Sequence, residues 1–241
     1  MYEFPKRSFL HKFLFKRAIL FPKVVCSTSQ DMAREAKLYV DREIVHTPFG
    51  VDTEKFKAEK KTGEGLVIGT VKSLEDVYGI DRLISVFASY CKKCDDQVSL
   101  QIYGSGSNEE ELKAQVNELE INDRVEFKGR VSGSSLIDAF EAIDVFVALS
   151  RRESFGVAVL EAQAAGCIAL TSDVGGLPEV VDPNSGIIVD GENELLACGK
   201  LKELVETRSE EKSASARKFV VENYSEKKCV ERMLRIYDEL V

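Results

Sequence analysis

Residues 150–166 read Ser-Arg-Arg-Glu-Ser-Phe-Gly-Val-Ala-Val-Leu-Glu-Ala-Gln-Ala-Ala-Gly and carry two glutamates, Glu153 and Glu161, eight positions apart. The preceding segment 144–149 is short and apolar, which indicates a buried strand. A turn of small residues follows and leads into an apolar helix over 155–165. Because the free N–H groups and the positive dipole end of a helix N-terminus attract anions, this strand, turn and helix predict a phosphate-binding site.

The chain around this stretch alternates between strand and helix patterns. Apolar runs of strand length lie at 66–71, 98–103, 124–127, 144–149, 168–171 and 186–189, and segments of helical period lie between them, for example at 79–92, 108–118, 134–142 and 155–165. Such alternation predicts an α/β domain with a doubly wound, Rossmann-like parallel sheet and helices on both faces. Residues 192–241 read as three helices, the last of them beginning at Tyr224-Ser225.

The residues before this domain form a smaller, separate unit. Two short strands at 24–27 and 43–46 flank a helix that begins after Ser29, a typical N-cap residue. Residues 51–65 are rich in charge and glycine, which predicts a linker. The first 50 residues are too few to form a second hydrophobic core alone.

Composition restricts the function classes. The chain has 241 residues, of which 44% are hydrophobic and 31% charged, as in ordinary globular proteins. A formal net charge of −8 argues against a nucleic-acid-binding surface. Several of the six cysteines fall in apolar runs, as reduced cytoplasmic cysteines do, and Cys91-Lys-Lys-Cys94 lacks the second pair of a metal site. We expect a cytoplasmic protein that binds no metal.

The N-terminal segment 1–21 alternates basic and apolar residues. Charges interrupt its apolar run throughout, so it predicts neither a signal peptide nor a membrane-spanning helix. Two interpretations remain. The helix packs within the protein, or it lies on an anionic membrane surface, which would place the protein at the inner face of the membrane.

Five stretches in this sequence resemble the landmarks of the retaining GT-B glycosyltransferases, the glycogen-synthase-like superfamily (glycosyl transferases group 1) with a Glu-x7-Glu motif. They are 50–52 followed by Phe56, then 102–106, 125–129, 150–166 and 175–180, in the family's order. The resemblance covers the chain from about Lys23 onward. It implies two Rossmann-like domains facing each other across a cleft, an N-terminal one for the acceptor and a C-terminal one for the nucleotide-sugar donor.

On that pattern the chain divides into four parts. Residues 1–50 are expected to be a remnant of the acceptor domain, 51–65 a linker, 66–223 the nucleotide-sugar-binding domain, and 224–241 a helix that crosses back to the acceptor side. Most of the family's acceptor domain has no counterpart in these 241 residues.

The ligands of an open α/β sheet bind beyond the carboxyl ends of its strands. The resemblance implies two catalytic residues there: Lys72, which would stabilise charge on the leaving diphosphate, and Glu153, near the donor-sugar hydroxyls. Glu161 would accept hydrogen bonds from the ribose hydroxyls, and the backbone N–H groups of 155–157 would hold the phosphates. The full expected donor-binding set is Gly104, Gly106, Arg130, Val131, Leu136, Ser154, Phe155, Gly156, Val157 and Glu161, with Val131 and Leu136 beside the base.

The sequence departs from the family at one position in the site. The family usually has a second lysine just before the glycine that opens the next helix, but Val77 and Tyr78 stand before Gly79. Losing one charge-assisted contact to a diphosphate costs on the order of 1.5–3 kcal/mol. The alternatives are slow turnover, no catalysis, or compensation by one of three nearby cations, Arg151, Arg152 or Arg82.

The resemblance implies transfer of a hexose, with retention, from a UDP- or GDP-hexose to a saccharide or lipid-linked acceptor, without a metal or cofactor. The alternative is a non-catalytic sugar-nucleotide-binding module, or one completed by a partner or missing domain that carries the acceptor site. A dinucleotide-binding dehydrogenase is disfavoured because the turn at Gly104-Ser105-Gly106 lacks the third glycine of that fingerprint.

Overall fold

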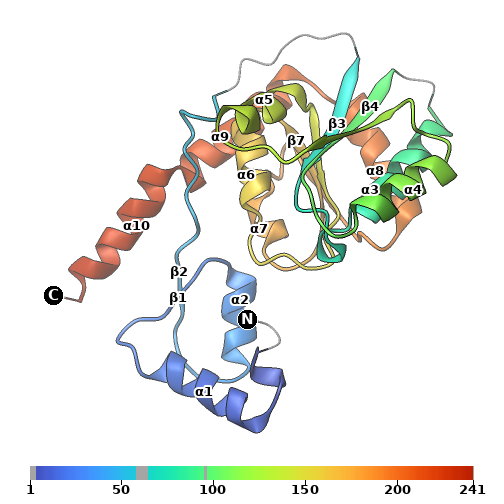
Figure 1. The fold of residues 1–241 in the computed structure, drawn as a ribbon. Helices are drawn as coiled ribbons and strands as arrows, with labels where there is room; N and C mark the ends of the chain where they lie inside the picture. Colours follow the sequence, from blue (N-terminus) through green and yellow to red (C-terminus); the bar gives the residue numbers. More distant parts are fainter. Residues whose placement is uncertain (1–3, 58–64, 95–96, 241) are drawn as a thin grey trace.

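The computed structural model describes residues 4–57, 65–94 and 97–240, and its main feature is one parallel sheet (Figure 1). The six strands are β3 (Leu66–Val71), β4 (Val98–Tyr103), β5 (Val125–Gly129), β6 (Val145–Ala148), β7 (Ile168–Ser172) and β8 (Ile187–Val189). Their order is β5-β4-β3-β6-β7-β8, and each neighbouring pair is parallel. The chain thus winds outward first to one side of β3 and then to the other. The predicted doubly wound sheet is confirmed.

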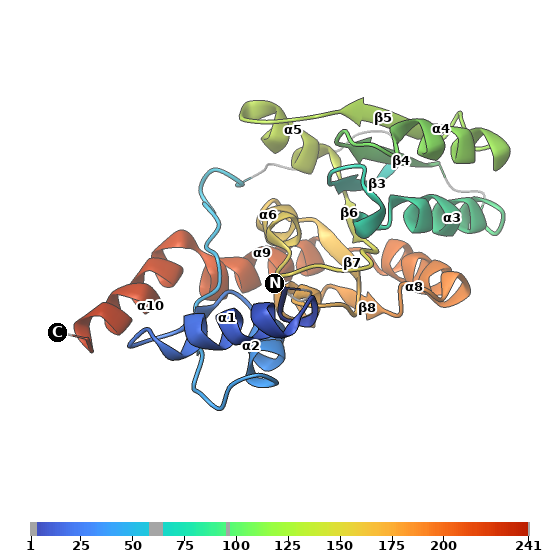
Figure 2. The ribbon, with the colours of Figure 1, turned by 60° about the horizontal axis from the view of Figure 1, so that its bottom comes forward.

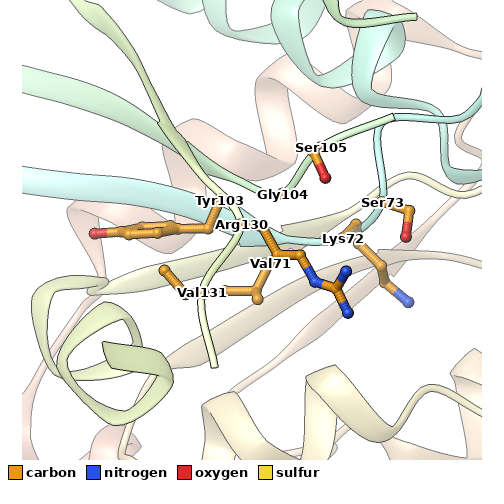
Figure 3. Close-up of a pocket in the computed structure, with 8 residues that line it drawn as sticks. All are labelled: Val71, Lys72, Ser73, Tyr103, Gly104, Ser105, Arg130 and Val131. Atoms are coloured by element: carbon orange, nitrogen blue, oxygen red, sulfur yellow. The ribbon is translucent and has the colours of Figure 1, made fainter. Parts of the chain in front are cut away.

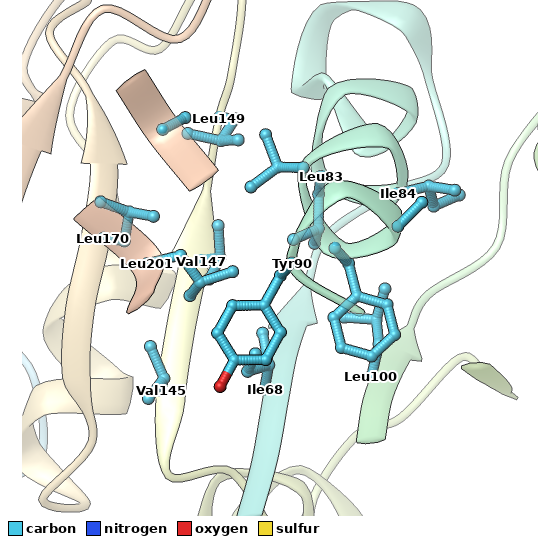
Figure 4. Close-up of a cluster of buried hydrophobic side chains, with 14 of the residues drawn as sticks. Ile68, Leu83, Ile84, Tyr90, Leu100, Val145, Val147, Leu149, Leu170 and Leu201 are labelled. Carbon is cyan, nitrogen blue, oxygen red and sulfur yellow. The ribbon is translucent and has the colours of Figure 1, made fainter. Parts of the chain in front are cut away.

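Helices cover both faces of this sheet. They are α3 (Ile80–Cys91), α4 (Glu109–Glu118), α5 (Ser134–Ala142), α6 (Val157–Ala164), α7 (Leu177–Val180), α8 (Glu194–Glu206) and α9 (Glu210–Tyr224). Side chains of β6 alternate between the two cores: Val145 and Val147 pack with α3 and α8, as Figure 4 shows, and Phe146 packs with α5 and α6. β6 and β7 are buried at every position and are continuous apolar runs, whereas the outer strand β5 alternates apolar and polar residues.

Most element bounds agree with the expected ones to within two residues. The strands 66–71 and 98–103 and the helix 134–142 coincide with the prediction. Helix α6 begins at Val157, later than predicted, because Gly156 adopts a positive φ of 108° and ends the turn there. The four-residue helix α7 was not predicted, since one turn is too short to show a helical period.

The N-terminal residues form a small unit beside the sheet. It contains a short 3-10 helix (Phe4–Lys6), α1 (Phe9–Leu20), β1 (Cys26–Ser27), α2 (Gln30–Lys37) and β2 (Val45–His46), and β1 pairs with β2 in parallel. Ser29 caps α2 as expected, because its hydroxyl accepts the N–H of Met32 at 3.1 Å. Figure 1 shows the unit on the α7 side of the molecule, and Figure 2 shows its helices α1 and α2 with that side turned forward.

The first part of the predicted linker packs against the sheet domain. Val51 and Phe56 are each 3% exposed and belong to the core beneath α5 and α6. Arg217 of α9 donates hydrogen bonds to the carbonyl oxygens of Thr53 (2.9 Å) and Phe56 (3.3 Å). Residues 58–64 of that linker lie outside the described residues.

The C-terminal helix α10 (Glu226–Asp238) leaves the sheet domain where the linker begins. Ser225 stands at its N-cap, but its side chain makes no capping hydrogen bond; instead its backbone bridges to Val51. The apolar side chains of Val230, Leu234 and Tyr237 are more than half exposed. None of the helices in the described part of the chain is long and apolar enough to cross a membrane.

Candidate functional site

A partly buried ion pair lies at the carboxyl ends of two adjacent strands. Lys72 follows β3 and Glu153 follows β6, and the Lys72 ammonium donates to Oε2 of Glu153. Their side chains are 9% and 13% exposed, so water screens the pair weakly. Tyr78 is one of the two residues, with Val77, that stand where the resemblance would place a second lysine. Its ring lies 5.1 Å from the Lys72 Nζ, within cation–π range. The two residues predicted to be catalytic are thus in direct contact.

A pocket of about 400 Å³ opens beside Lys72 (Figure 3). It is lined by Val71, Lys72, Ser73, Tyr103, Gly104, Ser105, Arg130 and Val131. Four of the predicted site residues, Lys72, Gly104, Arg130 and Val131, therefore share one pocket. Its two cations suit an anionic ligand.

Two other predicted residues, Gly106 and Leu136, do not line that pocket. Gly106 packs on the Leu74 backbone: a Cβ on Gly106 would lie 2.4 Å from the Leu74 carbonyl oxygen. Leu136 on α5 is partly buried against the core beneath α5 and α6. Gly104 combines both roles, because it lines the pocket while a Cβ on it would lie 1.8 Å from the Lys72 carbonyl oxygen. The glycines let the turn after β4 approach the segment that carries Lys72.

The turn between β6 and α6 supplies the remaining predicted contacts. Ser154 donates its N–H to Oε1 of Glu153 at 3.2 Å, which orients that carboxylate. Phe155 is buried, with its ring 6.1 Å from that of Tyr224, so it anchors the turn to the core. Gly156 is the N-cap of α6, and Val157, its first residue, is exposed. The N-terminus of α6 thus opens to solvent next to Glu153, as an anion site requires.

Glu161 lies on α6, a little more than one turn from the helix start. Burial raises the pKa of its carboxyl, and the positive charges of Lys55 and Lys72 partly oppose this rise. A desolvated carboxylate of this kind is stabilised when hydroxyl groups donate to it.

Three arginines were named as candidates for compensating the absent lysine, and the structure places them in different surroundings. Arg151 donates to both oxygens of the Asp81 carboxylate, at 2.7 and 2.6 Å, and this pairing raises the pKa of Arg151 and lowers that of Asp81. Arg82 pairs with Glu192 at 2.9 Å. Arg152 lines a pocket of about 220 Å³ together with Val77, Tyr78, Glu153 and Ser154.

A further pocket of about 400 Å³ lies between the N-terminal unit and the sheet domain. Its lining consists of Lys6, Asp31, Glu35, Arg152, Glu153, Val174 and Gly175. Glu179 of α7 joins the two parts beside it, because its carboxylate accepts the N–H groups of Gln30 (2.8 Å) and Asp31 (3.0 Å) at the start of α2. Glu153 therefore faces the junction of the two parts.

Sequence reasoning missed three residues that shape this region: Asp81, Glu179 and Lys55. Asp81 and Glu179 are ordinary helix carboxylates in sequence, and only the fold brings them to Arg151 and to α2. Lys55 lies shortly after the landmark Gly50-Val51-Asp52, and this position in the sequence is the feature that could have pointed to it. Within 4–57, 65–94 and 97–240, no group of three or more His, Cys, Asp or Glu side chains is arranged to hold a metal ion.

Known proteins resemble this chain in sequence and in fold. It is 30% identical over 179 residues to a GDP-mannose-dependent monoacylated alpha-(1-6)-phosphatidylinositol monomannoside mannosyltransferase of Corynebacterium glutamicum, covering 66% of this chain and 45% of that protein. It is also 30% identical over 146 residues to a D-inositol 3-phosphate glycosyltransferase of Corynebacterium diphtheriae, covering 58% and 34%. The chain spans less than half the length of these curated relatives.

Solved structures show the same fold at lower identity. Sucrose-phosphate synthase of Thermosynechococcus elongatus superposes with a TM-score of 0.85 at 19% identity, over 98% of this chain and 62% of that one. Anabaena HepE, solved with UDP and glucose, gives 0.83 at 18% identity, over 99% and 70%. The family model of glycosyl transferases group 1 matches residues 51–238, the segment that holds the sheet, the Lys72–Glu153 pair and Glu161. The chain belongs to the glycosyl transferases group 1 family.

Proposed function

We propose that this chain is the donor-binding half of a retaining hexosyltransferase that uses a nucleoside-diphosphate sugar. The observation that carries the proposal is the Lys72–Glu153 pair, which lies beside the open N-terminus of α6. A fixed cation and a carboxylate at this edge of the sheet match the two charges that the reaction develops. Negative charge grows on the leaving diphosphate and positive charge grows on the sugar.

The roles of the two residues follow from that charge distribution. Lys72 is held by Glu153 and by the ring of Tyr78, so it is positioned before any ligand arrives. A cation that is already oriented stabilises the leaving diphosphate without reorganisation during the reaction. Glu153 would then exchange part of its ion pair for the hydroxyls of the donor sugar.

The nucleoside would lie between the Lys72 pocket and α6. Arg130 and Val131 line that pocket, and Val131 would contact the base with Leu136 behind it. Glu161 supports this placement because its desolvated carboxylate has a raised pKa and gains from two ribose hydroxyl donors. The N–H groups at 155–157 would hold the phosphates.

Similar proteins indicate the class of the donor. A mannosyltransferase relative is described as GDP-mannose-dependent, and the HepE structure holds UDP, so we propose a UDP- or GDP-hexose as donor. We propose a saccharide or lipid-linked acceptor at the cytoplasmic side of the membrane, bound in the pocket between the N-terminal unit and Glu153.

One observation favours a second candidate, a partner-completed or non-catalytic sugar-nucleotide-binding module. Phe9, Leu10 and Phe13 on α1 are more than half exposed, and so are Val230 and Leu234 on α10. Apolar surface of this kind is typical of an interface. A partner chain or domain that carries the acceptor site would cover it.

Calorimetric titration of the folded chain with UDP, GDP and ADP, and with their glucose and mannose conjugates where these exist, tests the proposal. We expect one nucleotide to saturate the chain and Glu161→Ala to abolish or strongly weaken that binding. Lys113→Gln, a change on the exposed face of α4, serves as the matched control. A folded chain that binds none of these nucleotides would refute a donor site. Donor turnover by the chain alone would argue against the partner-completed candidate.

A further inference from the structure

The first turn of α2, in the N-terminal unit, is capped in part by a residue of the sheet domain. The N–H groups at the start of a helix have no partner within the helix. Ser29 accepts one of them, the N–H of Met32, at 3.1 Å. Two others, those of Gln30 and Asp31, donate to the two carboxylate oxygens of Glu179 on α7, at 2.8 and 3.0 Å. A negative charge thus lies at the positive end of the α2 dipole.

The surroundings of Glu179 favour these contacts. Its side chain is 16% exposed, so water competes weakly with the N–H donors. Nε2 of His46, on β2 of the N-terminal unit, lies 3.7 Å from Oε2 of Glu179. The Glu179 backbone is held by α9, because the Tyr224 hydroxyl donates to its carbonyl oxygen at 2.6 Å. The carboxylate therefore meets the N-terminal unit from a fixed position on the sheet domain.

Tyr224 also holds the covalent connection between the two parts. Its carbonyl oxygen accepts the N–H of Val51 at 2.8 Å, and the Val51 carbonyl oxygen accepts the N–H of Glu226 at 3.0 Å. The N-terminal unit is thus attached to the sheet domain through the chain at Val51 and through α2 at Glu179. The chain connection alone would act as a hinge, and the contact at Glu179 restricts rotation about it.

The contact at Glu179 also determines the shape of the 400 Å³ pocket between the two parts. Asp31 and Glu35, one turn apart on α2, line this pocket from the N-terminal unit. Glu153 and Gly175 line it from the sheet domain. Because Asp31 donates its N–H to Glu179, a movement of α2 away from α7 would also move the α2 carboxylates away from Glu153.

Resting on the proposed function, in which this pocket receives the acceptor, we infer that Glu179 is a positioning residue of the acceptor site. Its carboxylate caps α2 across the junction and keeps the pocket assembled before a ligand arrives. Glu179 does not line the other pocket, which contains Lys72 and Arg130. Loss of this carboxylate should therefore release the N-terminal unit and leave the donor site unchanged.

Hydrogen–deuterium exchange of the full chain, followed by mass spectrometry, tests the inference. We expect Glu179→Ala to speed exchange over residues 29–37 about tenfold or more, because two hydrogen bonds to a charged group are lost. Peptides covering β6 and β7 should exchange as in the parent chain. Glu179→Gln keeps one oxygen acceptor without the charge and should recover part of the protection. Glu222→Gln removes a carboxylate from the exposed face of α9 and should change neither region.

A double-mutant cycle tests the contact itself. Gln30→Pro removes one of the N–H groups that Glu179 accepts. Proline is tolerated at the first position of a helix, and the preceding residue, Ser29, has the extended ψ of 154° that proline requires. We expect Gln30→Pro to speed exchange over residues 31–37 in the parent chain but not in the Glu179→Ala background, because the contact is already absent there.

Calorimetric affinities for UDP and GDP separate this inference from the donor site, and we expect them to be unchanged in Glu179→Ala. Unchanged exchange over α2, an equal increase over β6 and β7, or equal effects of Gln30→Pro in both backgrounds would overturn the inference and leave the donor site standing. A loss of nucleotide affinity in Glu179→Ala would overturn it as well. Failure of the parent chain to bind either nucleotide would overturn the proposed function, and with it the acceptor role of Glu179, whatever the exchange shows over α2.

Discussion

The substitution Gly104→Ala should destabilise the fold by moving the segment that holds Lys72. Gly104 has a φ of 148°, which L side chains rarely adopt, and imposing it on alanine costs about 1–3 kcal/mol. The new Cβ would lie 1.8 Å from the Lys72 carbonyl oxygen, so the backbone must shift, at a further cost of about 1–3 kcal/mol. The expected loss of about 2–6 kcal/mol is a large fraction of a typical domain stability of about 5–15 kcal/mol.

Two other glycines separate these contributions. Gly129 also has a positive φ, 69°, but a Cβ there meets no atom within 4 Å, so Gly129→Ala should cost only about 1–2 kcal/mol. Gly199 lies inside α8 with open space around it, and Gly199→Ala should stabilise the chain by about 0.5–1 kcal/mol.

Urea unfolding followed by far-ultraviolet circular dichroism measures all three changes. We expect the midpoints to rank Gly199→Ala above the parent chain, then Gly129→Ala, then Gly104→Ala. Where Gly104→Ala remains folded, its UDP affinity should also fall, because Lys72 is displaced. Equal midpoints for the Gly104 and Gly129 variants would refute the reasoning, since the close approach to Lys72 would then impose no constraint.

Three further predictions concern charge and hydrogen bonding. Burial raises the pKa of Glu161, so the folded state binds the carboxyl proton more tightly than the unfolded state, and the free energy of unfolding falls as pH rises through the carboxyl range. Glu161→Gln should therefore raise the melting temperature at pH 7 while weakening nucleotide binding. A lower melting temperature would contradict this prediction. Tyr224→Phe removes a 2.6 Å hydrogen bond to the Glu179 carbonyl oxygen and should cost about 1 kcal/mol in urea unfolding. Burial raises the pKa of Tyr224 to about 12, so its phenol should stay protonated below pH 11 in a spectrophotometric titration, and an ordinary pKa near 10 would argue against this burial. Arg151→Gln breaks a partly exposed ion pair and should cost no more than about 1 kcal/mol at pH 7. Because the pair lowers the pKa of Asp81, its contribution is present above the ordinary value of 3.8 and is lost as pH falls through the lowered pKa. A deficit that stays unchanged while the pH is lowered until Asp81 is protonated would contradict the assignment.

The predicted sheet agrees with the structure because its strands are buried on both faces. That environment makes β6 and β7 short apolar runs, and the strands 66–71 and 98–103 were predicted with the observed bounds. The end of a strand is also local information, so Lys72, Gly104 and Glu153 could be placed at the same edge of the sheet. The helix start at Val157 was less accurate because it depends on the positive φ of Gly156, a property of the turn as folded.

The amino-acid sequence by itself determined the fold class, the family resemblance and the order of residues along the site edge. Those properties depend on hydrophobic period and on motif spacing, which are local in the chain. Tertiary structure alone decided the pairing of charges: Lys72 with Glu153 over 81 positions, and Arg151 with Asp81 over 70. A long cationic side chain can reach any carboxylate that the fold brings near it, and sequence separation does not restrict that choice.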